Sequence, residues 1–355
     1  MIWQEPPRGE FPDPAKFMAL PGLDQMRSFL TGHGPRPPIS YLTGMRPTDA
    51  GFGTCVFTMP ATEWLLPPQG LLYAGPLSIV ADGPLGGAIQ TTLPPATPYT
   101  TADLSLSMVR PAGPGGTLIA RGRSIHVGRS LGLSEVFVED DRGRLIAHGS
   151  SRCYIFSPFE APPAQPLDPW TEPEFETPHP YERPVEGEIL AREVWAEMDG
   201  LQILKSQIAG DLPPPPISML TGMRPVEASE GKAVFVLPAS LWLCPPHGNL
   251  LGGAIALVAD TALSCAVQTT VPAGQGYAAL DLRINFTRPV PPDGRDLTAT
   301  ASVVHRGRNI ALATAEVVNT EGKRVAFATA SVAIVARPVT AHGPLGSLEE
   351  LGPSE

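Results

Sequence analysis

The chain has 355 residues, 43% of them hydrophobic and 17% charged, and its formal net charge is −10 at pH 7. A chain of this length predicts about two domains. The acidic balance argues against a nucleic acid partner, because phosphate binding needs clustered Lys and Arg. The four cysteines have no paired spacing, so neither a disulfide framework nor a zinc site is indicated.

A long segment of the chain occurs twice. Pro-Pro-Ile-Ser-Tyr-Leu-Thr-Gly-Met-Arg-Pro at 37–47 returns at 215–225 with Met in place of Tyr, and the offset of 178 residues also maps Asp82 onto Asp260. This period is far longer than the roughly 20–50 residues of solenoid repeats. Each copy is therefore expected to be a complete domain.

The predicted elements follow the same order in both copies. An amphipathic helix begins at Gly22 and at Gly200, and a strand that ends at a proline starts at Cys55 and at Ala233. A longer apolar segment comes next, clearest at 252–267, and its length and its Ala and Leu content favour a helix. Because this helix is apolar on nearly every face, it is expected to be surrounded by protein.

Strands follow the apolar helix. In the second copy they are predicted at 281–286, 297–305, 310–318 and 325–334, and turns at 139–143 and 319–322 join the last two strands of each copy. The predicted fold class is α+β, with two tandem domains that each wrap an antiparallel sheet around a central helix.

The expected boundaries are 18–157 for the first domain, 158–187 for a Pro-rich linker, 188–338 for the second domain and 339–355 for a disordered tail. The first residues lack a basic region followed by an apolar run, and no apolar stretch reaches ~18 residues. These features predict a cytoplasmic protein with no membrane partner.

Several motifs of the second copy resemble one known family. They are Leu251-Gly252-Gly253 ahead of Asp260, Asp281-Leu282 ahead of Phe286-Thr287-Arg288-Pro289, then Gly307-Arg308 and Gly322-Lys323. In this order they resemble the hotdog-fold acyl-CoA thioesterases, specifically the phenylacetyl-CoA-thioesterase-like (PaaI-like) branch, over both copies. The resemblance implies a hotdog dimer fused into one chain, with two pseudo-equivalent sites between the copies. It also implies an acyl-CoA substrate and no cofactor or metal beyond the coenzyme A of that substrate.

The resemblance assigns the catalytic roles. The backbone N–H of Gly252 would stabilise the oxyanion, since a helix N-terminus favours negative charge, and Asp82 and Asp260 would be the bases or nucleophiles. Desolvation within an apolar helix is expected to raise a carboxyl pKa toward the range useful for general-base work. The competing interpretation is a structural helix Asp bonded to nearby backbone or hydroxyl groups.

The two sites are not expected to be equal. The family's His before the glycine pair is replaced by Leu251 in one copy and Tyr73 in the other, and a hydroxyl that assists the carboxylate maps to Thr101 but is absent at Ala279. The site expected to be stronger combines Gly252, Gly253, Asp82 and Thr101. The site expected to be weaker combines Ala74, Gly75 and Asp260.

Other residues are candidates for binding the substrate and its coenzyme. His247 and Asn249 precede the second apolar helix, and four arginines at strand ends match the region that binds phosphates and pantetheine in the family: Arg110, Arg288, Arg129 and Arg308. A solvated loop His and solvated arginines are the alternatives.

The sequence leaves three other functions open. A non-catalytic acyl-CoA-binding protein is favoured by the missing polar residues, whereas an enoyl-CoA hydratase would need Asp and His together near the helix, with only His247 available. The Gly128-Arg-Ser130-Leu-Gly132 pattern matches a serine nucleophile elbow, but a strand rather than a helix is predicted to follow it. The expected protein partner is a second copy, because sheet edges can pair to give a dimer of double hotdogs.

Overall fold

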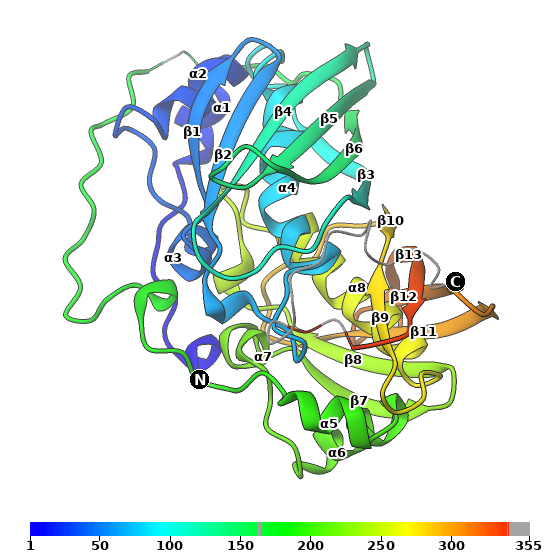
Figure 1. Cartoon of the computed structure of the whole chain (residues 1–355). Coiled ribbons are helices and arrows are strands. Elements are labelled where there is room, and N and C mark those ends of the chain that lie inside the picture. Colours follow the sequence, from blue (N-terminus) through cyan, green and yellow to red (C-terminus); the bar gives the residue numbers. More distant parts are fainter. Residues whose placement is uncertain (162, 164, 339, 341–355) are drawn as a thin grey trace.

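A computed structural model describes residues 1–161, 163, 165–338 and 340 (Figure 1). The expected disordered tail therefore lies outside the described residues, apart from Thr340. The elements of the first copy are η1 (Ile2–Gln4), α1 (Pro14–Met18), α2 (Gly22–Ser28), α3 (Pro38–Thr43), β1 (Arg46–Gly51), β2 (Thr54–Pro60), η2 (Glu63–Leu65), α4 (Ala74–Gln90), β3 (Tyr99–Met108), β4 (Thr117–Val127), β5 (Leu131–Glu139) and β6 (Leu145–Ile155).

The second copy repeats this order after the linker. Its elements are η3 (Pro180–Glu182), α5 (Arg192–Glu197), α6 (Gly200–Ala209), α7 (Pro216–Thr221), β7 (Arg224–Ser229), β8 (Lys232–Pro238), η4 (Leu241–Leu243), α8 (Gly252–Gln268), β9 (Gly276–Ala279), β10 (Asp281–Phe286), β11 (Asp296–Arg306), β12 (Ile310–Val318) and β13 (Arg324–Val335).

All of these strands belong to one antiparallel sheet that runs through both copies. Its order is β1-β2-β4-β5-β6-β3-β10-β13-β12-β11-β8-β7, with β9 paired to β13. The halves join at β3 and β10, where Asp281 pairs with Ser107 and Asn285 with Asp103. This join places two hotdog sheets side by side and confirms the predicted tandem hotdog fold.

The central helices α4 and α8 lie against the sheet and against each other (Figure 1). Their side chains are almost all buried, as the apolar pattern predicted. The backbones approach most closely at Gly253, where a Cβ atom would lie 2.3 Å from the Ser78 carbonyl oxygen. The Ser78 hydroxyl donates to the Gly253 carbonyl oxygen at 2.8 Å, so glycine and serine together fix the crossing of the helices.

One hydrophobic core includes residues of both copies, with Trp64 and Trp242 among its largest fully buried side chains. Residues before 18 and in the second half of the linker also pack on the domains, since Ile2 belongs to this core and Phe175 packs against it. The boundaries of the domains remain predictions. No helix within the described ranges is long and apolar enough to cross a membrane.

Candidate active site

Each central helix carries a carboxylate that meets the N-terminus of the other central helix. The Gly253 N–H of α8 donates to Asp82 Oδ2 of α4 at 2.9 Å, and the Gly75 N–H of α4 donates to Asp260 Oδ2 of α8 at 2.8 Å. The first amides of a helix have no partner within that helix, so a carboxylate is well placed there. Carboxylate and glycine thus come from different copies in both sites.

Both carboxylates are buried, which changes their acidity. Asp82 is 6% exposed and Asp260 is 4% exposed. Desolvation raises the pKa of Asp82 to about 6 against the opposing effect of the Gly253 and Gly252 amides. It raises the pKa of Asp260 to about 7, against the Gly75 amide and with a small contribution from the charge of Asp281. Such carboxyl groups exchange protons near neutral pH.

The second oxygen of each carboxylate is not held by the protein. Oδ1 of Asp82 and Oδ1 of Asp260 are buried and have no hydrogen-bond partner among the described residues. Most buried polar atoms in proteins do have partners. The fixed Oδ2 and the unpartnered Oδ1 therefore fit a carboxylate that is oriented by one oxygen and reacts through the other.

Gly252 lies tightly against the Asp82 side chain. A Cβ atom at this position would lie 2.9 Å from Asp82 Oδ2. The Gly252 amide contributes to lowering the Asp82 pKa, yet only the Gly253 amide has hydrogen-bond geometry toward the carboxylate. The Gly252 N–H is thus a donor at a helix N-terminus directly beside the Asp82 carboxylate.

Aromatic and polar side chains from both copies surround Asp82. The Tyr99 hydroxyl of β3 donates to Gln90 Oε1 at 3.2 Å, and its ring meets the His247 ring edge-on, with centroids 5.9 Å apart. His247 and Asn249 are exposed. Protein nevertheless surrounds the His247 ring closely enough that desolvation lowers its pKa, which favours the neutral imidazole.

The Asp260 site has the same framework but is closed. Tyr277 replaces Tyr99 and donates to Gln268 Oε1 at 2.7 Å, while Gln69, at the position of His247, donates to the Tyr277 hydroxyl. Tyr73 packs in a separate buried cluster with Leu71, Ala278 and Ala279. Gln69, Tyr73 and Tyr277 are each less than 9% exposed. The side chains beside Asp260 are thus buried where His247 beside Asp82 is exposed, and on this ground we call the two sites closed and open.

Thr101 does not contact Asp82 by a hydrogen bond among the described residues. It lies on β3 opposite Cys153 of β6. The Ser130 motif lies between β4 and β5, where Gly128 N–H donates to the Leu131 carbonyl at 2.8 Å. A strand follows it, as predicted, so the setting of a nucleophile elbow is absent from this described segment.

The four arginines are spread over the molecule. Arg110 lines a cavity of about 690 Å³ with Arg142 and Arg144. Arg288 is exposed after β10, and Arg129 and Arg308 are exposed on the β4–β5 and β11–β12 turns. Within the described ranges, no group of three or more His, Cys, Asp or Glu side chains has an arrangement that could hold a metal ion.

Tyr99 and Tyr277 were not predicted as site residues from the sequence. The offset of 178 relates them to each other, as it relates Gln90 to Gln268. Recurrence of a polar aromatic residue in both copies was the available signal. The sequence does not show that each tyrosine contacts a loop of the other copy, because that contact depends on how the two copies assemble.

Comparisons with known proteins identify the family of the chain. Residues 247–326 match the model of the thioesterase superfamily. The acyl-coenzyme A thioesterase PaaI of Escherichia coli (strain K12) is 34% identical over 108 residues, which are 30% of this chain and 73% of that protein.

Solved structures share the double-domain fold. The tesB protein of Mycobacterium avium subs paratuberculosis has a TM-score of 0.51 at 14% identity, covering 84% of this chain and 98% of that chain. Acyl-CoA thioesterase II TesB2 of Mycobacterium marinum has a TM-score of 0.51 at 13% identity, covering 83% and 97%. At these identities the likeness concerns the fold. Together with the PaaI match, it shows that the chain belongs to the hotdog-fold acyl-CoA thioesterase family, whose members are thioester hydrolases.

Proposed function

We propose that the chain hydrolyses an acyl-CoA thioester to a free acid and coenzyme A, chiefly at the site formed by Asp82, Gly252 and Gly253. The observation that carries this proposal is the buried Asp82 carboxylate, fixed through Oδ2 by the Gly253 amide with Oδ1 unpartnered. The neighbouring His247 side chain is exposed.

The proposed reaction begins with a water molecule whose oxygen attacks the thioester carbon while Asp82 takes its proton. The Gly252 N–H stabilises the negative charge on the former carbonyl oxygen, as donors in oxyanion holes do. The carbon–sulfur bond then breaks, and the proton held by Asp82 passes to the departing thiolate. Direct attack by the Asp82 carboxylate, followed by hydrolysis of the anhydride, uses the same residues. Neither route requires a metal or a redox cofactor.

The remaining candidates have supporting roles in this proposal. His247 and Asn249 contact the substrate from the loop before α8, since both are exposed beside the Asp82 site. Arg110, Arg288, Arg129 and Arg308 are proposed to bind the phosphates of coenzyme A, and Thr101 to assist Asp82 when substrate is present. A dimer of double hotdogs and a cytoplasmic location remain proposals, the latter supported by four free, buried cysteines among the described residues.

The Asp260 site is proposed to contribute little turnover. Its carboxylate is held in the same way by Gly75, but Tyr73, Tyr277 and Gln69 close around it. Gln69 also cannot exchange a proton, unlike His247 at the equivalent position. The two helix carboxylates therefore share a structural role, and the open surroundings of Asp82 favour catalysis there.

The test is release of free thiol from acyl-CoAs ranging from acetyl to palmitoyl, with phenylacetyl-CoA included. Wild type and the Asp82→Asn variant are compared at equal concentration. Turnover that is lost in the variant supports the proposal and identifies the preferred acyl group. Tight acyl-CoA binding without any release by wild type would instead favour a non-catalytic binding protein, for which the replacement of the family's His by Leu251 is the main argument.

A further inference from the structure

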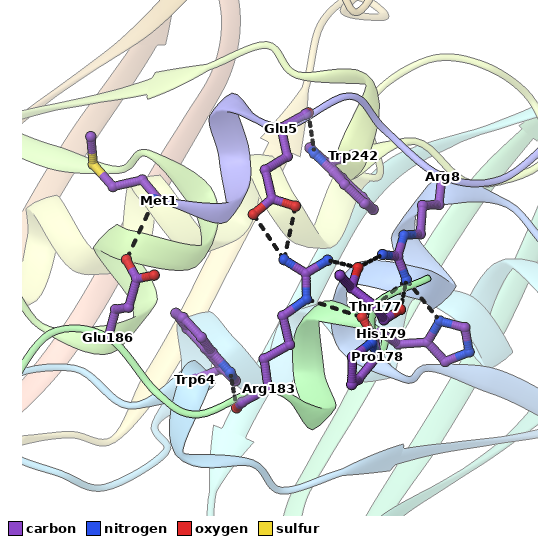
Figure 2. A network of polar contacts seen from close by, with 10 residues as sticks. All are labelled: Met1, Glu5, Arg8, Trp64, Thr177, Pro178, His179, Arg183, Glu186 and Trp242. Carbon is purple, nitrogen blue, oxygen red and sulfur yellow. Dashed lines mark hydrogen bonds and ion pairs between the residues drawn. The ribbon is translucent and has the colours of Figure 1, made fainter. Parts of the chain in front are cut away.

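The segment that precedes each copy, called its leader segment, packs on the other copy. The offset of 178 relates η1 to η3 and Glu5 to Arg183. Trp242 of the second copy donates its indole N–H to the Glu5 carbonyl oxygen at 3.0 Å, and Trp64 of the first copy donates to the Arg183 carbonyl oxygen at 3.0 Å. Each buried tryptophan is thus held by the leader segment of the other copy (Figure 2).

Aromatic packing strengthens this contact. Gly222 ends α7 with a positive φ of 80°, and a Cβ atom there would lie 2.7 Å from the Trp3 ring. Gly44 ends α3 with a φ of 74°, and its Cβ would lie 3.1 Å from the Tyr181 ring. Each leader therefore also packs under the end of a helix that belongs to the other copy.

The two leaders meet in an ion pair, drawn between the tryptophans in Figure 2. Arg183 Nη1 donates to both carboxylate oxygens of Glu5 at 2.8 Å. The Arg183 side chain is 16% exposed and the Glu5 side chain is 40% exposed, so the bidentate pair is shielded from water mainly on the Arg183 side. In a symmetric dimer of identical halves this position would face its own copy and a like charge. Only copies that have diverged can carry Glu on one side and Arg on the other.

The clasp formed by Glu5, Arg183 and Trp242 lies at the base of the loop that carries His247. Trp242 belongs to η4, which opens this loop, and Leu251 N–H donates to the Leu243 carbonyl at 3.0 Å to close it. The first copy also holds the loop through the Ile39 N–H, which donates to the Cys244 carbonyl at 3.3 Å.

We propose that Glu5 and Arg183 are positioning residues for the Asp82 site, which hold the loop 243–251 through Trp242 so that His247 stays against Tyr99. This inference rests on the proposed function. The equivalent bond from Trp64 to the Arg183 carbonyl holds the loop that leads to Gln69 and the closed Asp260 site. Trp64 therefore provides a matched control for Trp242, because Trp242 holds the loop of the open Asp82 site and Trp64 holds the loop of the closed Asp260 site.

The experiment compares Trp242→Phe with Trp64→Phe in acyl-CoA hydrolysis. Both variants keep an aromatic ring and lose one indole donor, so their melting temperatures are expected to fall by similar amounts. Trp242→Phe is expected to lower kcat by about fivefold through loss of loop positioning, whereas Trp64→Phe stays within about twofold of wild type. Equal kcat values in the two variants would overturn the proposal.

A second comparison links the clasp to His247. Glu5→Gln is expected to lower kcat by about threefold in the wild-type chain and to have no further effect in a His247→Gln background, where the residue matches Gln69. Independent, multiplicative losses of kcat would show that the clasp does not act through His247 and would overturn the proposal. If wild type releases no thiol at all, the proposed function fails; if wild type turns over and the two tryptophan variants do not differ, only the positioning role fails.

Discussion

Asp82 Oδ2 accepts a hydrogen bond from the Gly253 N–H, so a buried carboxylate of the first copy closes the helix N-terminus of the second. The reciprocal bond joins Asp260 to Gly75. Each bond helps to hold the copies together, and each also orients a carboxylate whose other oxygen has no described partner. Assembly of the copies and formation of the site are therefore the same event, which explains why one core spans both copies.

The two carboxylates are expected to differ in their contribution to turnover. Asp82→Asn removes the proton acceptor of the open site and is expected to lower kcat by about 10²-fold or more, in line with the usual effect of a general base. Asp260→Asn changes the closed site and is expected to lower kcat by less than about threefold. Steady-state thiol release under saturating acyl-CoA measures both. Equal losses would show that both sites work.

The pH dependence of hydrolysis should report the Asp82 carboxyl. Burial raises its pKa to about 6, and a base acts only when deprotonated. Log(kcat/KM) is therefore expected to rise with pH below about 6 and to level off above it. A rate profile from pH 4.5 to pH 8, taken with Asp260→Asn in parallel, gives the measurement. A profile that is already level at the acidic end of this range, as a base with the ordinary Asp pKa of 3.8 would give, would contradict the assignment.

Asp260 should make the protein less stable as the pH rises. Its pKa is about 7 in the folded chain against an ordinary value of 3.8. Between these values the folded state holds a proton that the unfolded state has lost, so stability falls as the pH increases through this window. The Asp260→Asn variant carries no charge at this position. Its free energy of unfolding is expected to exceed that of wild type at about pH 8 by on the order of 2 kcal/mol, and to be similar near about pH 4. Denaturant titrations at both pH values test this, and a difference independent of pH would refute it.

The sequence predicted the architecture well because the apolar helix at 252–267 and the strand at 281–286 carry clear periodic patterns. The pairing of Asp82 with Gly253 was also expected, through the family resemblance. What the sequence could not supply was the contact between Tyr99 and His247 or the closing of the Asp260 site by Tyr73. Both depend on residues about 150–200 positions apart meeting across the interface, and no local pattern encodes such a meeting.

The leader segments show the same limit. Residues 2–4 and 180–182 have no hydrophobic period, and the Pro-rich composition around the second suggested only a linker. Their 3-10 turns matter because Trp3 and Tyr181 pack on Gly222 and Gly44 of the other copy. The repeat offset alone was the sequence signal that relates the two segments.

A Gly253→Ala variant tests how tightly α4 and α8 pack where they cross. A Cβ atom there would lie 2.3 Å from the Ser78 carbonyl oxygen, which is backbone and cannot rotate away. Gly253→Ala is therefore expected to push α8 from α4, to destabilise the chain by about 1–3 kcal/mol and to reduce kcat, since the amide that orients Asp82 moves with the helix. Gly113→Ala is the matched control, because nothing lies within 4 Å of its Cβ position. Melting temperature and thiol release are measured for both variants. A Gly253→Ala protein that melts and turns over like the Gly113→Ala protein would show that the helices have room to separate, and that the Gly253 amide does not set the position of Asp82.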